Sequence, residues 1–155
     1  MQRFNLHTHS TYSDGKCSME ATVEEAIRQG LHTLGFSDHS MVPFESNVSI
    51  QNDKVDEYIN NLRKLKVENA SKITILSSME MEFIPGIVTD FQKTKRDLGL
   101  DYLIGSVHLV GTDPEHLWFI DGKHIEPYDE GLRDYFGGDI RKGVRAYFDQ
   151  ENLMI

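Results

Sequence analysis

The sequence has a single cysteine, no long apolar run and no secretory leader. Cys17 is the only cysteine among 155 residues, which excludes an internal disulfide. No apolar stretch approaches the roughly 18 residues of a membrane-spanning helix, and the N-terminus lacks the charged and apolar pattern of a signal peptide. These absences predict a cytoplasmic protein with no membrane partner, in which Cys17 is a loop residue and not a nucleophile.

Positive charge is also scarce. The 16 Lys and Arg residues are outnumbered by 25 Asp and Glu residues, which gives a formal net charge of -9. Proteins that bind long nucleic acids normally carry a basic patch, so no such partner is expected. The same acidic balance disfavours an anionic small substrate unless bound cations reverse the field locally.

Internal repeats, low-complexity segments and linkers are absent as well, and apolar runs alternate with amphipathic stretches. Hydrophobic residues make up 39% of the chain, enough for the core of one domain. Strands are predicted at residues 4–7, 33–37, 73–79 and 101–107. Helices are predicted at residues 19–29, 54–69, 87–98 and 139–151. This order predicts an α/β fold with parallel strands and right-handed crossovers.

Local signals mark the ends of two helices and leave one long connection. Ser18 can cap the first helix, and Gly30 can end it in the left-handed conformation. Asp139 can cap the last helix, whose inward-facing residues are predicted to be Ile140, Val144, Tyr147 and Phe148. The connection from residue 108 to residue 139 is predicted to be a functional or mobile loop, in which Trp118 packs under the loop or shapes a pocket.

Residues that can bind a metal follow each of the four predicted strands. They are His7 and His9, then Asp38-His39, then Glu80, and finally His108. In a parallel α/β barrel the carboxyl ends of the strands share one face, so these side chains can meet in space. Packing alone does not explain this pattern, which predicts a site for several metal ions. Mixed His and carboxylate ligands suit Zn²⁺, Mn²⁺ or Fe²⁺ better than Ca²⁺ or Mg²⁺.

The earlier motifs each have a plainer alternative. His7 and His9 leave the same face of a strand and can grip one ion, or they are a pair of surface histidines. Asp14 can reach that face from the turn at Gly15, or it belongs to an ordinary Asp-Gly turn. His39 is a ligand, or an exposed histidine next to a helix-entry aspartate.

The later motifs are open in the same way. Glu80 follows a buried strand, where an unpaired charge is costly, and bridging two cations would compensate that cost. Glu82 shares its face and either orients a ligand or is a solvated rim residue. His108 on its own is more often a satisfied core residue than a ligand. His116 and His124 are predicted to be loop residues with at most a role in substrate binding.

Taken together, these motifs resemble those of the PHP (polymerase and histidinol phosphatase) superfamily. The resemblance rests on His7-Thr8-His9, Ser13-Asp14-Gly15, Ser37-Asp38-His39, Glu80 and Gly105-Ser106-Val107-His108. Within the superfamily the chain is most similar to the histidinol-phosphate phosphatases, through residues 101–108 and Gly137-Gly138-Asp139. The resemblance covers nearly the whole chain. It implies a distorted seven-stranded β/α barrel, related to the TIM barrel, with a trinuclear metal centre at the carboxyl ends of its strands.

The resemblance also implies the ligands. Carried over to this sequence, the sets are His7, His9 and Glu80 for one ion, Glu80 with His108 for a second, and Asp14 with His39 for a third. Glu80 and His108 are the expected catalytic residues. The implied cofactors are two or three divalent ions of Mn, Zn or Fe.

Two later motifs of the family have no counterpart in this sequence. They are a histidine after the fifth or sixth strand and a terminal Asp-x-His. A complete eight-stranded β/α barrel takes about 250 residues, whereas this chain supplies about four β/α units. We therefore expect residues 1–155 to be a C-terminally truncated PHP-type domain, the N-terminal part of the family fold. Its open strand edge is expected to favour self-association.

The activity implied by the resemblance is hydrolysis of a phosphate monoester. The expected reaction converts L-histidinol phosphate to L-histidinol and phosphate, a step of histidine biosynthesis. One alternative is a PHP phosphoesterase that acts on nucleotides or nucleic-acid ends. The other is a non-catalytic fragment, which binds metal or pairs its exposed strand with another chain.

Overall fold

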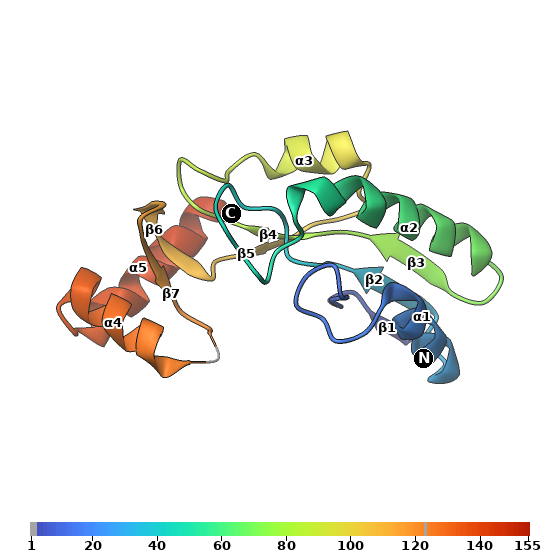
Figure 1. The fold of residues 1–155 in the computed structure, drawn as a ribbon, viewed down its shortest axis with the longest axis horizontal. Coiled ribbons are helices and arrows are strands. Elements are labelled where there is room, and N and C mark those ends of the chain that lie inside the picture. Colours follow the sequence, from blue (N-terminus) through green and yellow to red (C-terminus); the bar gives the residue numbers. More distant parts are fainter. Residues whose placement is uncertain (1–2, 123) are drawn as a thin grey trace. The chain divides into compact units, whose positions relative to one another are not determined.

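Strands and helices alternate along the chain as far as residue 77, in agreement with the α/β prediction, whereas three successive strands and then two helices follow residue 98 (Figure 1). The computed structural model describes residues 3–122 and 124–155. The chain forms two compact units. The first comprises the chain up to Met81 together with Phe91–Ile104, and the second comprises Glu82–Asp90 and Gly105–Ile155.

A three-stranded parallel sheet is the centre of the first unit. Its strands β1 (Phe4–Asn5), β2 (Thr33–Phe36) and β3 (Thr74–Ser77) lie in the order β1-β2-β3. The register pairs Leu34 of β2 with Ile75 of β3. The predicted parallel arrangement is therefore confirmed for these three strands.

Two helices pack along this sheet. Helix α1 (Met19–Arg28) contacts β2, and α2 (Val55–Glu68) runs beside β3 (Figure 1). The Ser18 hydroxyl caps α1 by accepting a hydrogen bond from the Ala21 amide at 3.3 Å. Gly30 follows the helix with a φ of 72°, a left-handed conformation that favours glycine. Both predicted helix ends are thus confirmed.

The core of the first unit lies between these helices and the sheet. Its fully buried side chains include Met19, Val23, Leu34, Phe36, Tyr58 and Leu62. Tyr58 belongs to α2, which follows the short 3-10 helix η1 (Asn52–Lys54). Its hydroxyl donates a hydrogen bond to the Ser78 carbonyl at 2.8 Å. Burial, together with the negative charge of Asp38, holds the pKa of Tyr58 well above its usual value of 10.

A tyrosine also braces the end of the first strand. The Tyr102 hydroxyl donates a hydrogen bond to the carbonyl of Leu6, directly before the predicted ligand His7. Gly35 of β2 makes room for this contact, because a Cβ there would collide with the Tyr102 hydroxyl. The position of His7 therefore depends on a residue that lies far from it in the sequence.

The predicted third strand and third helix differ in their bounds from the structure. The chain leaves β3 and forms a second short strand, β4 (Glu80–Glu82). Helix α3 (Phe91–Leu98) begins later than the predicted helix at residues 87–98. The reason is a turn at Gly86, whose φ is 78°, across which Ile84 pairs with Val88.

The second unit contains a β-hairpin where the sequence predicts a loop. Strands β6 (Leu109–Asp113) and β7 (His116–Phe119) pair antiparallel, with Val110 opposite Trp118. The Asp113 carboxylate accepts a hydrogen bond from the Glu115 amide at 3.0 Å. This bond stabilises the turn between the two strands. Helix α4 (Ile125–Phe136) follows. The loop prediction is therefore wrong, and His116 lies on a strand.

Trp118 organises the packing of the second unit. It is 2% exposed, and its indole nitrogen donates a hydrogen bond to the Tyr128 carbonyl at 3.0 Å. A Cβ at Gly131 of α4 or at Gly143 of α5 (Ile140–Met154) would lie 2.5 or 2.7 Å from the indole ring. The two glycines let both helices approach the indole closely. Trp118 thus packs beneath the surface, one of the two roles considered for it.

The orientation of α5 differs from the prediction. Asp139 caps the helix as expected, by accepting a hydrogen bond from the Arg141 amide. Three of the four residues predicted to face inward, Ile140, Val144 and Phe148, are exposed. Gly143 and Gln150 are buried in their place.

The reason lies in the hydrogen bonds of Gln150. Its amide nitrogen donates to the carbonyls of Phe83 and Leu109 at 2.7 and 2.8 Å, and its carbonyl accepts from the Gly111 amide at 3.0 Å. Gln150 thus bonds to three backbone groups of the second unit, two carbonyls and one amide. The hydrogen bonds of Gln150 and the packing against Trp118 thus determine which face of α5 is buried. The apolar stripe of the helix does not.

The structure confirms the α/β class but not a barrel. The remaining strand, β5 (Ile104–Ser106), falls within the predicted strand at residues 101–107. In the part of the chain that the structure describes, the strands do not close into a barrel. That the chain supplies about four β/α units of a partial barrel therefore remains a prediction.

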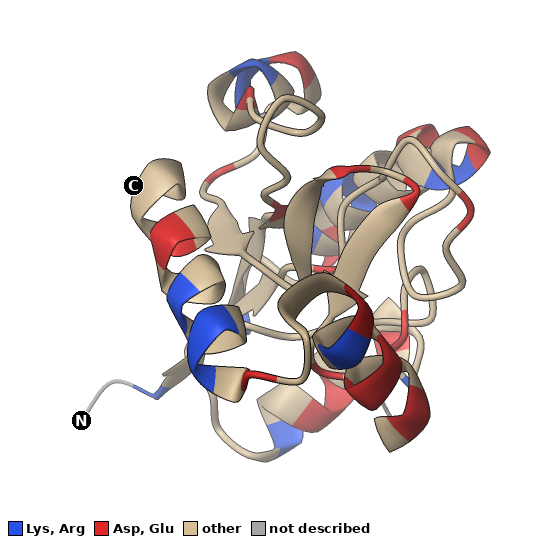
Figure 2. Ribbon diagram, turned by 90° about the vertical axis from the view of Figure 1, so that its left-hand side faces the viewer, with Lys and Arg blue, Asp and Glu red and all other residues tan. Residues whose placement is uncertain are grey.

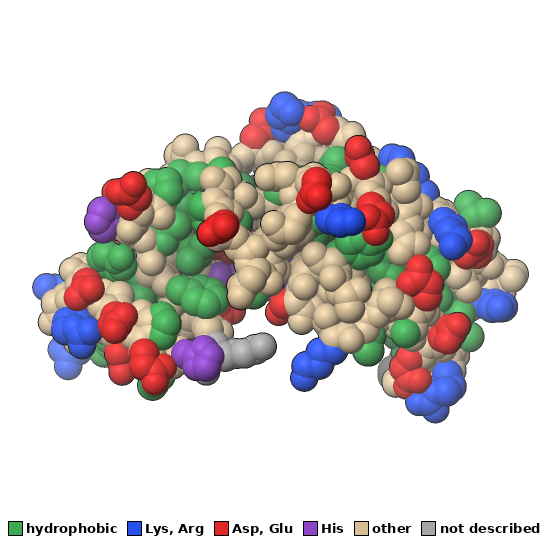
Figure 3. All heavy atoms as spheres, viewed as in Figure 1, with side chains coloured by type: hydrophobic (Ala, Val, Ile, Leu, Met, Phe, Trp, Pro, Cys, Tyr) green, Lys and Arg blue, Asp and Glu red, His purple; other side chains and the backbone are tan. Residues whose placement is uncertain are grey.

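Charged residues belong mainly to the helices and their connections (Figure 2). On the face shown in Figure 3, Lys and Arg side chains are interspersed with Asp and Glu side chains and do not gather into one basic patch. Among the described residues no helix is long and apolar enough to span a membrane. The cytoplasmic location remains a prediction from the sequence.

Candidate metal centre

The backbone of the first unit gathers four of the predicted ligands. His7 and His9 follow β1, His39 follows β2, and Glu80 begins β4. The segments of His39 and Glu80 pair in parallel, because the Ser40 amide donates to the Glu80 carbonyl at 2.8 Å. These strand ends therefore place their side chains in one region, as the parallel arrangement predicts.

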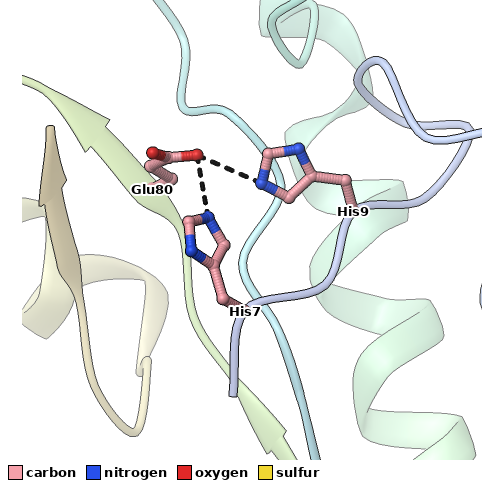
Figure 4. Close-up of side chains that lie close together, drawn as sticks. All are labelled: His7, His9 and Glu80. Carbon is pink, nitrogen blue, oxygen red and sulfur yellow. Dashed lines mark hydrogen bonds and ion pairs between the residues drawn. The ribbon is translucent and has the colours of Figure 1, made fainter. Parts of the chain in front are cut away.

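One oxygen of Glu80 is the focus of this region. Glu80 Oε2 lies 3.1 Å from His7 Nε2 and 3.1 Å from His9 Nε2 (Figure 4). The same oxygen is 3.3 Å from His39 Nδ1. Ligands that each bind one ion at about 2.1 Å lie roughly 3.0–3.4 Å apart, so the separations of His7 and His9 from Glu80 match co-ligands of a single cation. The Glu80 side chain is 6% exposed, and the three imidazoles compensate its buried charge.

A second group lies on the other side of His9. Asp14 Oδ1 is 2.8 Å from His9 Nδ1 and 3.8 Å from His39 Nε2. The candidate ligand atoms of His9, Asp14 and His39 all lie within 4.8 Å of one another, as do those of His7, His9 and Glu80. His9 therefore faces a carboxylate through each of its ring nitrogens.

The donor set fits a divalent cation. His9 Nε2 is buried and has no hydrogen-bond partner, although Glu80 Oε2 is only 3.1 Å away. The two atoms approach each other without the alignment of a hydrogen bond, as two ligands do when they converge on one ion. A buried nitrogen and a buried carboxylate oxygen are suitable ligands for Zn²⁺, Mn²⁺ or Fe²⁺.

The electrostatics of the group show how strongly its members interact. The neighbouring Glu80 carboxylate, and to a lesser extent Asp14, raise the pKa of His9 to about 9, although burial acts in the opposite direction. Burial would by itself raise the pKa of Asp14. The hydrogen bond from His9 and the charge of His39 outweigh burial and lower it below its usual value. Without a metal, a proton on His9 takes the place of the cation.

In the second unit, Glu82 holds His108. Glu82 Oε2 lies 2.7 Å from His108 Nδ1, and Glu82 Oε1 accepts hydrogen bonds from the amides of His108 and Leu109 at 2.8 and 2.9 Å. Glu82 is 7% exposed, so the solvated-rim alternative is wrong. A histidine held through Nδ1 presents Nε2 to a metal, the usual carboxylate–histidine arrangement. The role of His108 as a ligand remains a prediction.

Two further aspartates lie near these groups, and the sequence motifs do not predict a role for either. Asp121 Oδ2 lies 3.6 Å from His108 Nε2, and nothing in the sequence pattern points to it. Asp38 was considered only as the neighbour of His39, yet its side chain is completely buried. The complete burial of an aspartate next to a predicted ligand is a signal that only the structure provides.

Comparisons with known proteins agree with these motifs. A family model for the PHP domain matches residues 5–150. The chain belongs to the PHP domain family. Two curated relatives bear the name probable histidinol-phosphatase. The Schizosaccharomyces pombe protein is 32% identical over 84% of this chain and 48% of its own length, and the Deinococcus radiodurans protein is 29% identical over 78% and 49%.

A third PHP relative has a different name. The DNA polymerase/3'-5' exonuclease PolX of Bacillus subtilis is 27% identical over 73% of this chain and 19% of its own length. The chain thus spans about half the length of the two histidinol-phosphatase relatives that it matches.

Two solved structures resemble this one. A candidate histidinol phosphatase from Listeria monocytogenes matches with a TM-score of 0.80 over 96% of this chain and 59% of that chain, at 21% identity. It shows the fold. The histidinol phosphate phosphatase from Lactococcus lactis, solved with zinc, L-histidinol and phosphate, matches with a TM-score of 0.56 at 26% identity, over 72% of this chain and 42% of that chain.

Proposed function

We propose that this chain is the N-terminal part of a PHP-family phosphate monoester hydrolase and carries the first ligands of its metal centre. The observation that supports this most strongly is the convergence of His7, His9 and His39 on one oxygen of Glu80. A simple pair of surface histidines would not bring three imidazoles to one buried carboxylate oxygen. A cation shared among them accounts for the cluster.

The proposed ligand sets are those that the family resemblance implies, and their residues in the first unit lie close together. His7, His9 and Glu80 hold one ion, and Asp14 with His39 holds another. His108 is proposed as a ligand, and with Glu80 as a catalytic residue, on the family resemblance. The other ligands of each ion would come from the part of the family fold that this sequence does not include. Residues 1–155 would accordingly be a C-terminally truncated PHP-type domain.

Each residue has a definite task in the proposed reaction. Glu80 supplies a buried negative charge that holds cations close together. His9 gives up its proton before it binds, because its pKa is about 9 in the metal-free protein. Glu82 keeps His108 in the tautomer whose Nε2 can bind. If bound here, divalent ions would lower the pKa of a water molecule and neutralise the phosphate oxygens.

The proposed substrate is L-histidinol phosphate, and the proposed location is the cytoplasm. The substrate is supported by the two relatives named as probable histidinol-phosphatases and by the Lactococcus structure, which holds zinc, L-histidinol and phosphate. The acidic balance of -9 disfavours an anionic substrate in the absence of cations, so metal binding and substrate binding are linked in this proposal.

A second function is supported by the similarity to the Bacillus PolX protein. It is a phosphoesterase that acts on nucleotides or nucleic-acid ends. The formal net charge of -9 disfavours binding of a long nucleic acid, so short nucleotides are the better candidates.

Phosphate release tests the proposal. The purified chain, loaded with Mn²⁺ or Zn²⁺, is offered L-histidinol phosphate and a panel of nucleotides. We expect release from L-histidinol phosphate that is lost in the variant Glu80→Gln together with bound metal. The same release from Glu80→Gln as from the original chain would refute the role of Glu80. Metal binding without turnover would favour the non-catalytic fragment, which lacks the later ligands of the family.

A further inference from the structure

A buried carboxylate that belongs to neither ligand group lies beneath the metal centre. Asp38 directly precedes the proposed ligand His39 and is 0% exposed. Its Oδ1 atom accepts hydrogen bonds from the amide of Ser10 at 2.7 Å and from the hydroxyl of Ser10 at 2.9 Å. The hydroxyl of Ser13 donates a third bond to this oxygen at 2.7 Å. One oxygen atom thus receives three donors from a loop that lies 25 or more residues earlier.

The loop that Asp38 holds is the one that carries His9 and Asp14. Within the loop, the Ser10 carbonyl accepts hydrogen bonds from the amides of Ser13 at 3.1 Å and Gly15 at 2.9 Å. These bonds make the turn compact. They do not attach it to the neighbouring strand, and the side chain of Asp38 supplies that attachment.

Asp38 also connects the loop to the remaining ligands. Its backbone carbonyl accepts a hydrogen bond from the Glu80 amide at 3.0 Å. Its own position in the chain fixes His39, the next residue. The same residue is therefore joined to the segments that carry His9, Asp14, His39 and Glu80.

Stability alone does not account for a carboxylate here. Asp38 Oδ2 is buried and has no hydrogen-bond partner, an arrangement that costs free energy. A buried polar atom without a partner in the protein calls for an explanation, such as a bound water or ion, local strain or a functional role. A carboxylate oxygen can accept three hydrogen bonds at once, which a loop anchor for metal ligands requires.

We propose that Asp38 is a positioning residue, which fixes the loop of residues 10–14 so that His9 and Asp14 lie beside His39 and Glu80 at the proposed metal centre. The inference rests on the proposed metal centre and extends it to a residue that is not a ligand. The three hydrogen bonds on Oδ1 hold the ligands in place before an ion arrives. The affinity for the metal ion then depends on hydrogen bonds to Asp38, a residue that does not itself bind the ion.

The variant Ser13→Ala tests this role with the smallest change. It removes one of the three hydrogen bonds and leaves Asp38 and every proposed ligand in place. The probe is Co²⁺, whose affinity is measured by calorimetry with a competing chelator and whose visible absorption reports ligand geometry. We expect an affinity lower by about tenfold or more, the usual loss when an outer partner of a ligand is removed. The absorption band should change with it.

Two companion variants separate positioning from general damage. Ser13→Thr keeps a hydroxyl at the same place and should restore affinity. Thr11→Ala changes an exposed side chain in the same loop and should bind Co²⁺ as the original chain does. In the metal-free Ser13→Ala variant, the Ser10 amide should exchange its hydrogen faster, because its bond to Asp38 is weakened.

The outcomes are distinguishable. Unchanged affinity and an unchanged spectrum in Ser13→Ala would overturn the positioning role while leaving the metal centre intact. An affinity in Ser13→Thr as low as in Ser13→Ala would also overturn it. If the original chain bound no Co²⁺, the proposed metal centre would fail, and the positioning role would fail with it.

Discussion

Raising the pH should affect metal affinity and metal-free stability in opposite directions. The cause is His9, whose pKa is raised from 6.5 to about 9 by the Glu80 carboxylate, with a further contribution from Asp14. In the metal-free protein near neutral pH this imidazole is protonated and paired with the two carboxylates. A metal ion must displace that proton before it can bind.

The size of both effects follows from the pKa. Loss of one proton makes apparent metal affinity rise about tenfold per pH unit, or about 100-fold between pH 7 and pH 9, and level off above that. The shift from 6.5 to about 9 is worth about 3 kcal/mol of folding free energy. Because the folded pKa is raised, this stabilisation is complete below pH 6.5 and is lost as the pH rises toward 9.

Three measurements check this prediction. An NMR titration of the metal-free chain should place the His9 ring near pH 9. Chelator competition should show Zn²⁺ affinity rising with pH, while urea unfolding of the metal-free chain should show stability falling. The variant His9→Gln should lose the stability slope, and the exposed His32→Gln should keep it. A His9 pKa near 6.5, or a metal affinity independent of pH between 7 and 9, would refute the reasoning.

Three further predictions concern other parts of the molecule. Gly143→Ala should lower the free energy of unfolding by about 1–3 kcal/mol, because its Cβ would lie 2.7 Å from the Trp118 ring, whereas the exposed Lys142→Ala should be nearly neutral in thermal unfolding. Glu82→Gln should weaken metal binding about tenfold or more if His108 is a ligand, and equal Zn²⁺ content in both proteins would contradict that role. Self-association through an open strand edge should give a mass above 17.8 kDa by light scattering, and a monomer at all concentrations would contradict it.

Much of the first unit could be predicted because its signals are local. Short apolar runs predicted the strands, Ser18 and Gly30 predicted the ends of α1, and helical periodicity predicted α1 and α2. Parallel strands direct their carboxyl ends to one edge, so ligands that follow each strand were expected to meet. His9 and Glu80 do so in the structure.

The second unit was harder to predict because its decisive contacts are not local. The hairpin depends on an Asp113 turn and on the burial of Trp118, neither of which produces a strong periodic pattern. Helix α5 has an apolar stripe that predicted the wrong buried face. Gly143 and Gln150 set its orientation through contacts with Trp118 and with backbone groups of the unit.

The role of Asp38 could not be predicted for a similar reason. The sequence shows only an aspartate next to a histidine. Its three donors come from Ser10 and Ser13, on a loop between two other ligands. A serine in a polar loop carries no sign that its hydroxyl points to a buried carboxylate.

Metal content is the most direct test of the central claim, that the histidines around Glu80 form a metal centre. The purified chain and its Glu80→Gln variant are equilibrated with Zn²⁺, freed of loose ions by dialysis, and analysed for bound metal and for folding. The account predicts at least one tightly held ion per chain, lost in a variant that still folds. Equal metal content in the two proteins, or none in the original chain, would contradict it.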